Sequence, residues 1–228
     1  MIRIVILIAI LSICACASGA GARAGQDPKP SVPLAKELEG LAPEPRIAYL
    51  RHLASSRPDD PEVFFQLGVA FHETGEGDSA LHYYGRSLDL DPSLSKAYVN
   101  MGVLWDGRGG FERALELFDR AIEINPEDLL AHTHAALALL EHKRYEESWK
   151  YLDRALGIAP RDPQPRFILA IYFWECGMFR EALAEWETVI ELVPGTALAA
   201  QAEKNIALLQ RALSEASSGG RPLPAEGR

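Results

Sequence analysis

The chain has few cysteines and no pattern that would pair them. Two of its three cysteines, Cys14 and Cys16, lie in an apolar N-terminal segment, which leaves Cys176 alone in the rest of the 228 residues. A disulfide within the folded region is therefore excluded. We interpret Cys176 as an ordinary packing residue near the end of a helix.

Signatures of catalysis are also missing. The chain has no Gly-x-Ser-x-Gly elbow, and Gly107-Arg108-Gly109-Gly110 lacks the lysine and the strand of a phosphate-binding loop. His132 and His134, the closest pair of histidines, would point about 200° apart on a helix, whereas helical metal ligands are spaced three or four residues apart. We expect no enzymatic activity, no cofactor and no metal ion.

Basic residues are not concentrated in any stripe. The formal net charge is -9, and lysines and arginines are scattered among acidic residues along the chain. A nucleic-acid groove needs a continuous basic surface, so this composition argues against nucleic acid as a partner.

Proline, by contrast, recurs at a constant interval. Five prolines are spaced 34 residues apart: Pro58, Pro92, Pro126, Pro160 and Pro194. Proline inside a helix costs about 3 kcal/mol, so prolines at a constant spacing mark the boundaries between helices. The interval itself indicates one structural unit copied in tandem.

Other residues recur with the prolines. The first unit contains Phe64, Leu67-Gly68, Phe71, Ala80 and Tyr84, and similar residues follow at 34-residue spacing. This pattern resembles the tetratricopeptide repeat and predicts two amphipathic helices in each unit. The resemblance implies an all-α fold, a right-handed α-solenoid of four helix hairpins. The four repeats are residues 61–94, 95–128, 129–162 and 163–196.

Small and large residues have distinct expected roles in these hairpins. Asp60 and Asp162, each followed by proline, are expected to cap helices. Glycines are expected in the turns inside the hairpins: Gly75, Gly109-Gly110 and Gly177. Small residues are expected where helices approach closely: Gly68, Gly102, Ala136 and Ala170. Large residues are expected to fill the space between neighbouring units: Tyr84, Phe118, Leu152 and Trp186.

The two ends of the repeat array need covers for their apolar faces. We predict an N-terminal half-repeat over residues 34–60, with a short helix at 34–41, a break at Pro43 and Pro45, and a helix at 46–56. A capping helix is predicted over residues 197–216, with Thr196 as its N-cap. Residues 217–228 are predicted to be a disordered tail.

The N-terminus has the pattern of a signal for export. Residues 1–16 combine Arg3 with a short apolar run and end in a segment that resembles a bacterial lipobox, with Cys16 as the lipidated residue. Cleavage by an ordinary signal peptidase, near Ala17 or Ala24, and an uncleaved anchor remain alternatives. Residues 17–33 resemble a flexible tether. We expect an exported protein, either an outer-membrane lipoprotein facing the periplasm or a periplasmic or secreted protein.

The resemblance also implies which side chains face a partner. In the family, the first helix of each hairpin lines a concave groove. The corresponding positions are Phe65, Val69, His72, Val99, Val103, Asp106, Leu137, Leu140, Glu141, Phe167, Ile171 and Trp174. We expect exposure of Phe167 and Trp174, and leave open whether the aliphatic residues face the groove or pack between successive first helices. An acidic rim of Glu73, Asp106, Glu141 and Glu175 favours a basic flank on the partner.

Taken with the missing catalytic signatures, the resemblance implies a non-catalytic adaptor. We expect it to bind an apolar or amphipathic segment of a partner protein in an apolar groove, in the assembly of a bacterial envelope complex. Two alternatives remain. The chain could be a regulatory subunit of a cell-wall enzyme complex, or a carrier that holds a lipid-like ligand in the groove.

Overall fold

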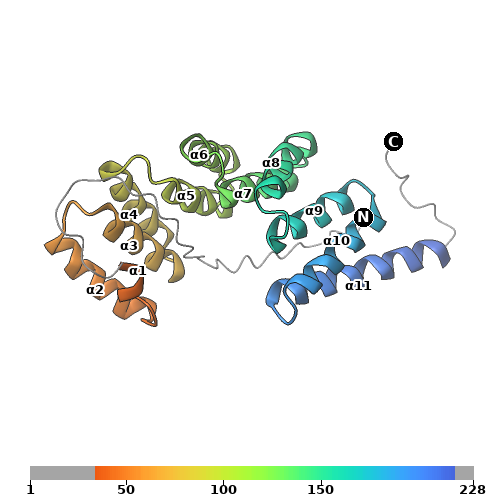
Figure 1. The fold of residues 1–228 in the computed structure, drawn as a ribbon, viewed down its shortest axis with the longest axis horizontal. Helices are drawn as coiled ribbons and strands as arrows, with labels where there is room; N and C mark the ends of the chain where they lie inside the picture. Colours follow the sequence, from red (N-terminus) through yellow and green to blue (C-terminus); the bar gives the residue numbers. More distant parts are fainter. Residues whose placement is uncertain (1–33, 219–228) are drawn as a thin grey trace. The chain divides into compact units, whose positions relative to one another are not determined.

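The computed structural model describes residues 34–218, and within that range all regular structure is α-helical. These described residues divide into two compact units, with the division after Asn100. Figure 1 labels the helices. They are α1 (Leu34–Glu37), α2 (Pro43–Ser56), α3 (Pro61–Glu73), α4 (Gly77–Leu90), α5 (Ser95–Gly107), α6 (Phe111–Ile124), α7 (Leu129–Glu141), α8 (Tyr145–Ile158), α9 (Pro163–Glu175), α10 (Phe179–Leu192) and α11 (Ala197–Ser218). Helix α5 begins in the first unit and ends in the second.

The helices pack in sequence order within each unit. In the first unit α3 packs against α2 and α4, and in the second α7 packs against α8 and α9 against α10. Helix α11 covers α10 at the end of the second unit (Figure 1). None of the helices described between residues 34 and 218 is both long and apolar enough to cross a membrane.

Aspartates and prolines fix where the first helices begin. The Asp60 carboxylate accepts a hydrogen bond from the Glu62 amide at 3.0 Å, and the Asp162 carboxylate accepts one from Gln164 at 2.8 Å. Proline follows each cap. The N–H that proline lacks would have no acceptor within the helix at this position, so no hydrogen bond is lost. The two predicted caps are confirmed, and Asp128 caps α7 in a similar way.

The tight turns between paired helices need a left-handed residue. Gly75, Gly109 and Gly177 have φ angles of 78°, 78° and 77°, as expected of glycine in this region. Lys143 takes the same place between α7 and α8 with a φ of 59°. Its side chain makes this conformation more costly than it is for glycine.

Close approach inside a hairpin depends on glycine. A Cβ added to Gly68 of α3 would lie 2.4 Å from the Tyr84 ring of α4, and one added to Gly102 of α5 would lie 2.5 Å from the Phe118 ring of α6. The predicted need for small residues at these positions is explained by these contacts. The prediction that the rings fill space between neighbouring units was incomplete, because each ring packs on the glycine of its own hairpin.

The predicted helix limits at the two ends need correction. Helix α2 begins at Pro43, so Pro43 and Pro45 lie in its first turn and do not form a break; proline is tolerated there because the first turn lacks intrahelical acceptors. Helix α1 ends at Glu37, short of the predicted residue 41. Helix α11 continues to Ser218, beyond the predicted residue 216, and the Thr196 hydroxyl accepts a hydrogen bond from Ala199 at 3.3 Å.

Three predicted segments lie outside the described residues. These are the export signal at 1–16 with Cys16, the tether at 17–33, and the part of the tail from residue 219 onward.

Candidate partner-binding surfaces

In the first unit the predicted groove residues are mostly covered. Phe65, Val69 and Val99 are buried, and His72 is half-buried. The Lys96 ammonium lies 4.3 Å from the centre of the Phe65 ring and 2.7 Å from the Glu62 carboxylate. Charged side chains therefore lie over Phe65, which is not an accessible anchor.

In the second unit the apolar groove positions of α7 and α9 pack between helices. Leu137, Leu140, Phe167 and Ile171 are buried, and α7 contacts α9 directly. The expectation that Phe167 is exposed was wrong, since only 7% of its surface is accessible. For the aliphatic residues Leu137 and Ile171, this burial agrees with the alternative that they pack between successive first helices.

Trp174 and Val103 remain partly accessible. Both side chains are half-buried, and the Trp174 ring packs edge-on against Trp186 of α10 with 5.3 Å between ring centroids. Trp174 lies near the end of α9, as Asp106 does near the end of α5. The apolar surface left at the groove positions is consequently small.

Two of the four acidic rim residues already have partners. Glu73 forms an ion pair with Arg46 of α2. The Glu175 carboxylate accepts a hydrogen bond from the Tyr145 hydroxyl at 3.3 Å. These contacts occupy the carboxylates that the sequence pattern assigned to a partner's basic flank.

Asp106 and Glu141 are different, since neither carboxylate makes a hydrogen bond or ion pair with another described residue. Burial raises the pKa of the half-buried Asp106, and the charge on His142 lowers it in part. Partial burial raises the pKa of Glu141, and the nearby Asp106 carboxylate raises it further. The structure thus brings two predicted rim residues close enough to repel each other.

The residues beside this pair are held in place by the hairpin. The His142 ring stacks on Phe111 with 3.8 Å between centroids, and its Nδ1 lies 2.9 Å from the Ala138 carbonyl oxygen. The Arg144 guanidinium also lies over the Phe111 ring, at 5.4 Å from its centre. Asp106, Glu141 and His142 therefore form a polar cluster at the ends of α5 and α7, in which the His142 ring is held in place.

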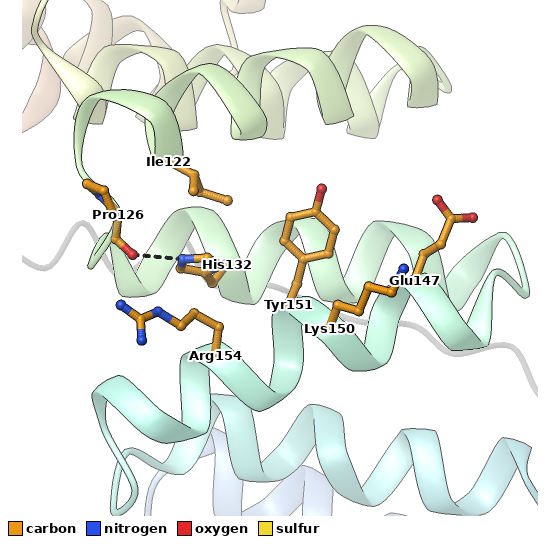
Figure 2. Close-up of a pocket in the computed structure, with 7 residues that line it drawn as sticks. All are labelled: Ile122, Pro126, His132, Glu147, Lys150, Tyr151 and Arg154. Carbon is orange, nitrogen blue, oxygen red and sulfur yellow. Dashed lines mark hydrogen bonds between the residues drawn. The ribbon is translucent and has the colours of Figure 1, made fainter.

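A pocket of about 480 Å³ lies elsewhere on the second unit (Figure 2). Its lining residues are Ile122, Pro126, His132, Glu147, Lys150, Tyr151 and Arg154. None of them is a groove position of the repeat pattern. The sequence analysis missed this pocket because its residues come from three helices and one connection and share no common motif.

Comparisons with known families agree with the hairpin architecture. Residues 61–94 and residues 106–163 each match a family model described as a tetratricopeptide repeat. A search of curated proteins finds no match.

Solved structures with similar folds include two that are described as tetratricopeptide proteins. A thermophilic tetratricopeptide protein of Thermus thermophilus has 20% identity and a TM-score of 0.64, over 78% of this chain and 96% of its own. MamA of Desulfovibrio magneticus has 22% identity and a TM-score of 0.60, over 69% of this chain and 89% of its own. YrrB, described as a tetratricopeptide protein with an unusual peptide-binding site, has 22% identity and a TM-score of 0.55, over 72% of this chain and 84% of its own.

These matches confirm the predicted all-α fold of tetratricopeptide hairpins. They also suggest the general role of such folds, which is to act as a scaffold for protein–protein interaction.

Proposed function

This chain is a tetratricopeptide-repeat protein, and from that premise we propose that it is a non-catalytic scaffold that binds a basic segment of a partner protein. The binding surface is the end of α5 and α7 in the second unit, where Asp106 and Glu141 lie. The peptide-binding site described for YrrB supports a peptide-like ligand.

The observation that carries this proposal is the unpaired state of the two carboxylates. Burial destabilises the ionised form of Asp106, which His142 offsets only in part, and burial together with the Asp106 charge destabilises that of Glu141. A lysine or arginine of the partner would relieve both effects at once. Charged hydrogen bonds of this kind are stronger than neutral ones and favour one orientation of the bound segment.

The apolar contribution is smaller than a continuous apolar groove would provide. Trp174 and Val103 are the half-buried apolar side chains at groove positions of the second unit. Tryptophan is enriched at binding hot spots, so Trp174 is the aromatic side chain at these positions that can anchor a partner. The segment that fits best carries a basic residue and, separated from it, one apolar residue that reaches Trp174.

Binding of peptides with controlled composition tests this proposal. An array of twelve-residue peptides, in which lysine, arginine and leucine are placed singly or together, is incubated with the purified full chain. We expect retention only of peptides that combine a basic and an apolar residue. Equal retention of peptides in which glutamine replaces every basic residue would overturn the proposal.

We also propose that the scaffold works in the bacterial envelope and is anchored through Cys16. The support is the sequence alone, namely the short apolar run that ends in Ile13-Cys14-Ala15-Cys16. Metabolic labelling of cells with a palmitate analogue tests it, with Cys16→Ser as the control. We expect label on the native chain and none on the variant; an unlabelled native chain in the membrane fraction would instead indicate an uncleaved anchor.

A further inference from the structure

The pocket of the second unit is formed by one face of α8 and by the connection opposite it. Ile122 comes from α6, Pro126 from the α6–α7 connection and His132 from α7. The remaining residues are spaced along one face of α8: Glu147, Lys150, Tyr151 and Arg154. Figure 2 shows Arg154 extending toward Pro126 and His132, while Lys150 extends toward Glu147. The volume of about 480 Å³ is enough to hold a side chain of a partner.

The walls of the pocket are fixed by hydrogen bonds. His132 is only 6% exposed, and its Nε2 lies 3.0 Å from the Pro126 carbonyl oxygen, so this nitrogen carries a proton. Its Nδ1 has no partner among the described residues. The Tyr151 hydroxyl donates to the Asp119 carboxylate at 2.6 Å, and burial together with this bond raises the pKa of Tyr151.

The charges around the pocket leave two unused cations. Glu147 is bound by two nitrogens of Arg144, at 2.7 Å and 2.6 Å, and this contact lowers the pKa of Glu147. Arg154, in contrast, makes no hydrogen bond or ion pair with any residue described in the structure. Arg144 is shared between Glu147 and Glu112, which lies 3.5 Å from it, so it adds no surplus charge. Lys150, like Arg154, makes no hydrogen bond or ion pair with a described residue, and these two cations line the pocket.

We propose that this pocket binds the carboxylate of an acidic side chain from a partner protein. The planar guanidinium of Arg154 matches the two oxygens of a carboxylate, and Lys150 adds a second positive charge. Ile122 and Pro126 provide an apolar wall for the methylene groups of the same side chain. The Glu147 carboxylate in the same lining repels a doubly charged phosphate more strongly than a singly charged carboxylate, so the pocket fits a carboxylate better.

This pocket shares no residue with the carboxylate pair Asp106 and Glu141. The two sites also carry opposite charges. The pocket takes an acidic residue, whereas the pair takes a basic one. A partner segment with both kinds of residue could therefore occupy the two surfaces of one chain. Either surface can fail its test without affecting the other.

Titration of the ¹⁵N-labelled full chain with N-acetylglutamate methylamide, followed by NMR, tests the proposal. We expect saturable shifts of the backbone amides of residues 147–154 and of the Arg154 Nε–H. Replacing the ligand by its glutamine analogue should abolish them. Arg154→Gln should weaken binding by about fivefold or more, which corresponds to the loss of about 1 kcal/mol.

A matched control separates the pocket from general charge effects. Arg113 is an exposed arginine of α6 that is paired with Glu116 and lies outside the pocket, so Arg113→Gln should leave the affinity unchanged. Equal weakening by both variants, or equal binding of the glutamine analogue, would overturn the proposal. Tighter binding of inorganic phosphate at the same residues would also overturn the assignment to a carboxylate.

Discussion

Lys96 lies over the Phe65 ring, with 4.3 Å between its ammonium and the ring centre, and the same ammonium is 2.7 Å from Glu62. Glu62 and Lys96 are 34 residues apart and occupy the same position in successive repeats. The pair therefore joins α3 to the start of α5 and covers an aromatic ring that would otherwise face the groove. In the first unit the groove positions around Phe65 therefore present charged side chains to the surface, and the aromatic ring is buried under them.

Removing the Lys96 side chain should lower stability only moderately. Lys96→Ala loses a cation–π contact and a partly exposed ion pair, each of which typically contributes about 0.5–1 kcal/mol or less. We expect the free energy of unfolding in urea to fall by about 1 kcal/mol, and by less at high salt. Lys96→Arg should retain most of this free energy. An equal loss of unfolding free energy in both variants would show that the positive charge at this position is unimportant.

The contact between Gly68 and Tyr84 predicts a larger effect. In Gly68→Ala the new methyl group would lie 2.4 Å from the buried Tyr84 ring, so the hairpin of α3 and α4 must open. Overpacking of this kind costs about 1–3 kcal/mol. Urea unfolding followed by circular dichroism should show that loss.

Gly85 provides the matched control in the same hairpin. It lies inside α4, and a Cβ there would meet nothing within 4 Å. Gly85→Ala should therefore stabilise the chain by about 0.5–1 kcal/mol through helix propensity. If both glycine variants lose stability alike, the close approach at Gly68 is not the cause.

Local sequence signals predicted the helices well. The Asp-Pro pairs and the 34-residue proline interval depend on backbone rules that act within a few residues, so Asp60 and Asp162 could be identified as caps in advance. Pro43 was misread because the same rule that excludes proline from a helix interior allows it in the first turn.

Burial of the groove positions could not be predicted in this way. The repeat pattern indicates the direction in which Phe65 and Phe167 point, but their exposure depends on residues of the next helix, such as Lys96. The unpaired state of Asp106 and Glu141 likewise depends on which cations reach them in space. Arg46 reaches Glu73 and leaves it neutralised, and no sequence spacing distinguishes these carboxylates.

Lys143 holds a turn conformation that glycine adopts at lower cost. Its φ of 59° is in the left-handed region, which costs a residue with a side chain about 1–2 kcal/mol. We expect Lys143→Gly to raise stability by up to about 1 kcal/mol, since part of the gain is offset by the greater freedom of glycine in the unfolded chain.

The reverse change tests the same argument. Gly109 has a φ of 78° with open space around it, so Gly109→Lys adds backbone strain without a steric clash. The midpoint of urea unfolding should fall in Gly109→Lys and rise in Lys143→Gly. A fall in both would mean that the Lys143 side chain stabilises the turn by contacts that outweigh its strain.

His134 should make the second unit sensitive to acid. The ring stacks on Phe118 with 5.8 Å between centroids, and burial lowers the pKa of His134 from 6.5 to about 4. The unfolded chain then binds a proton more readily than the folded chain, so stability is complete above pH 6.5 and is lost as the pH falls toward 4. At about 1.36 kcal/mol per pKa unit, the full loss is about 3 kcal/mol.

Comparison with a variant isolates this contribution from that of the carboxylates. His134→Phe retains an aromatic ring and removes the titrating group. Between about pH 7 and about pH 4.5 its free energy of unfolding should fall by about 2 kcal/mol less than that of the native chain. Parallel pH profiles would show that His134 is protonated without cost in the folded state.

The most direct test of the proposed scaffold function uses one basic peptide that the array has selected. The measurement is the affinity of this peptide for the native chain and for variants in which carboxylates are neutralised. Isothermal titration calorimetry compares the native chain with Asp106→Asn/Glu141→Gln and with the control Asp153→Asn/Glu187→Gln, which changes the net charge equally at exposed positions. We predict that the first variant binds at least about tenfold more weakly, a loss of about 1.4 kcal/mol, and that the control binds like the native chain. Unchanged affinity in the Asp106 and Glu141 variant, or equal weakening in both, would contradict the account.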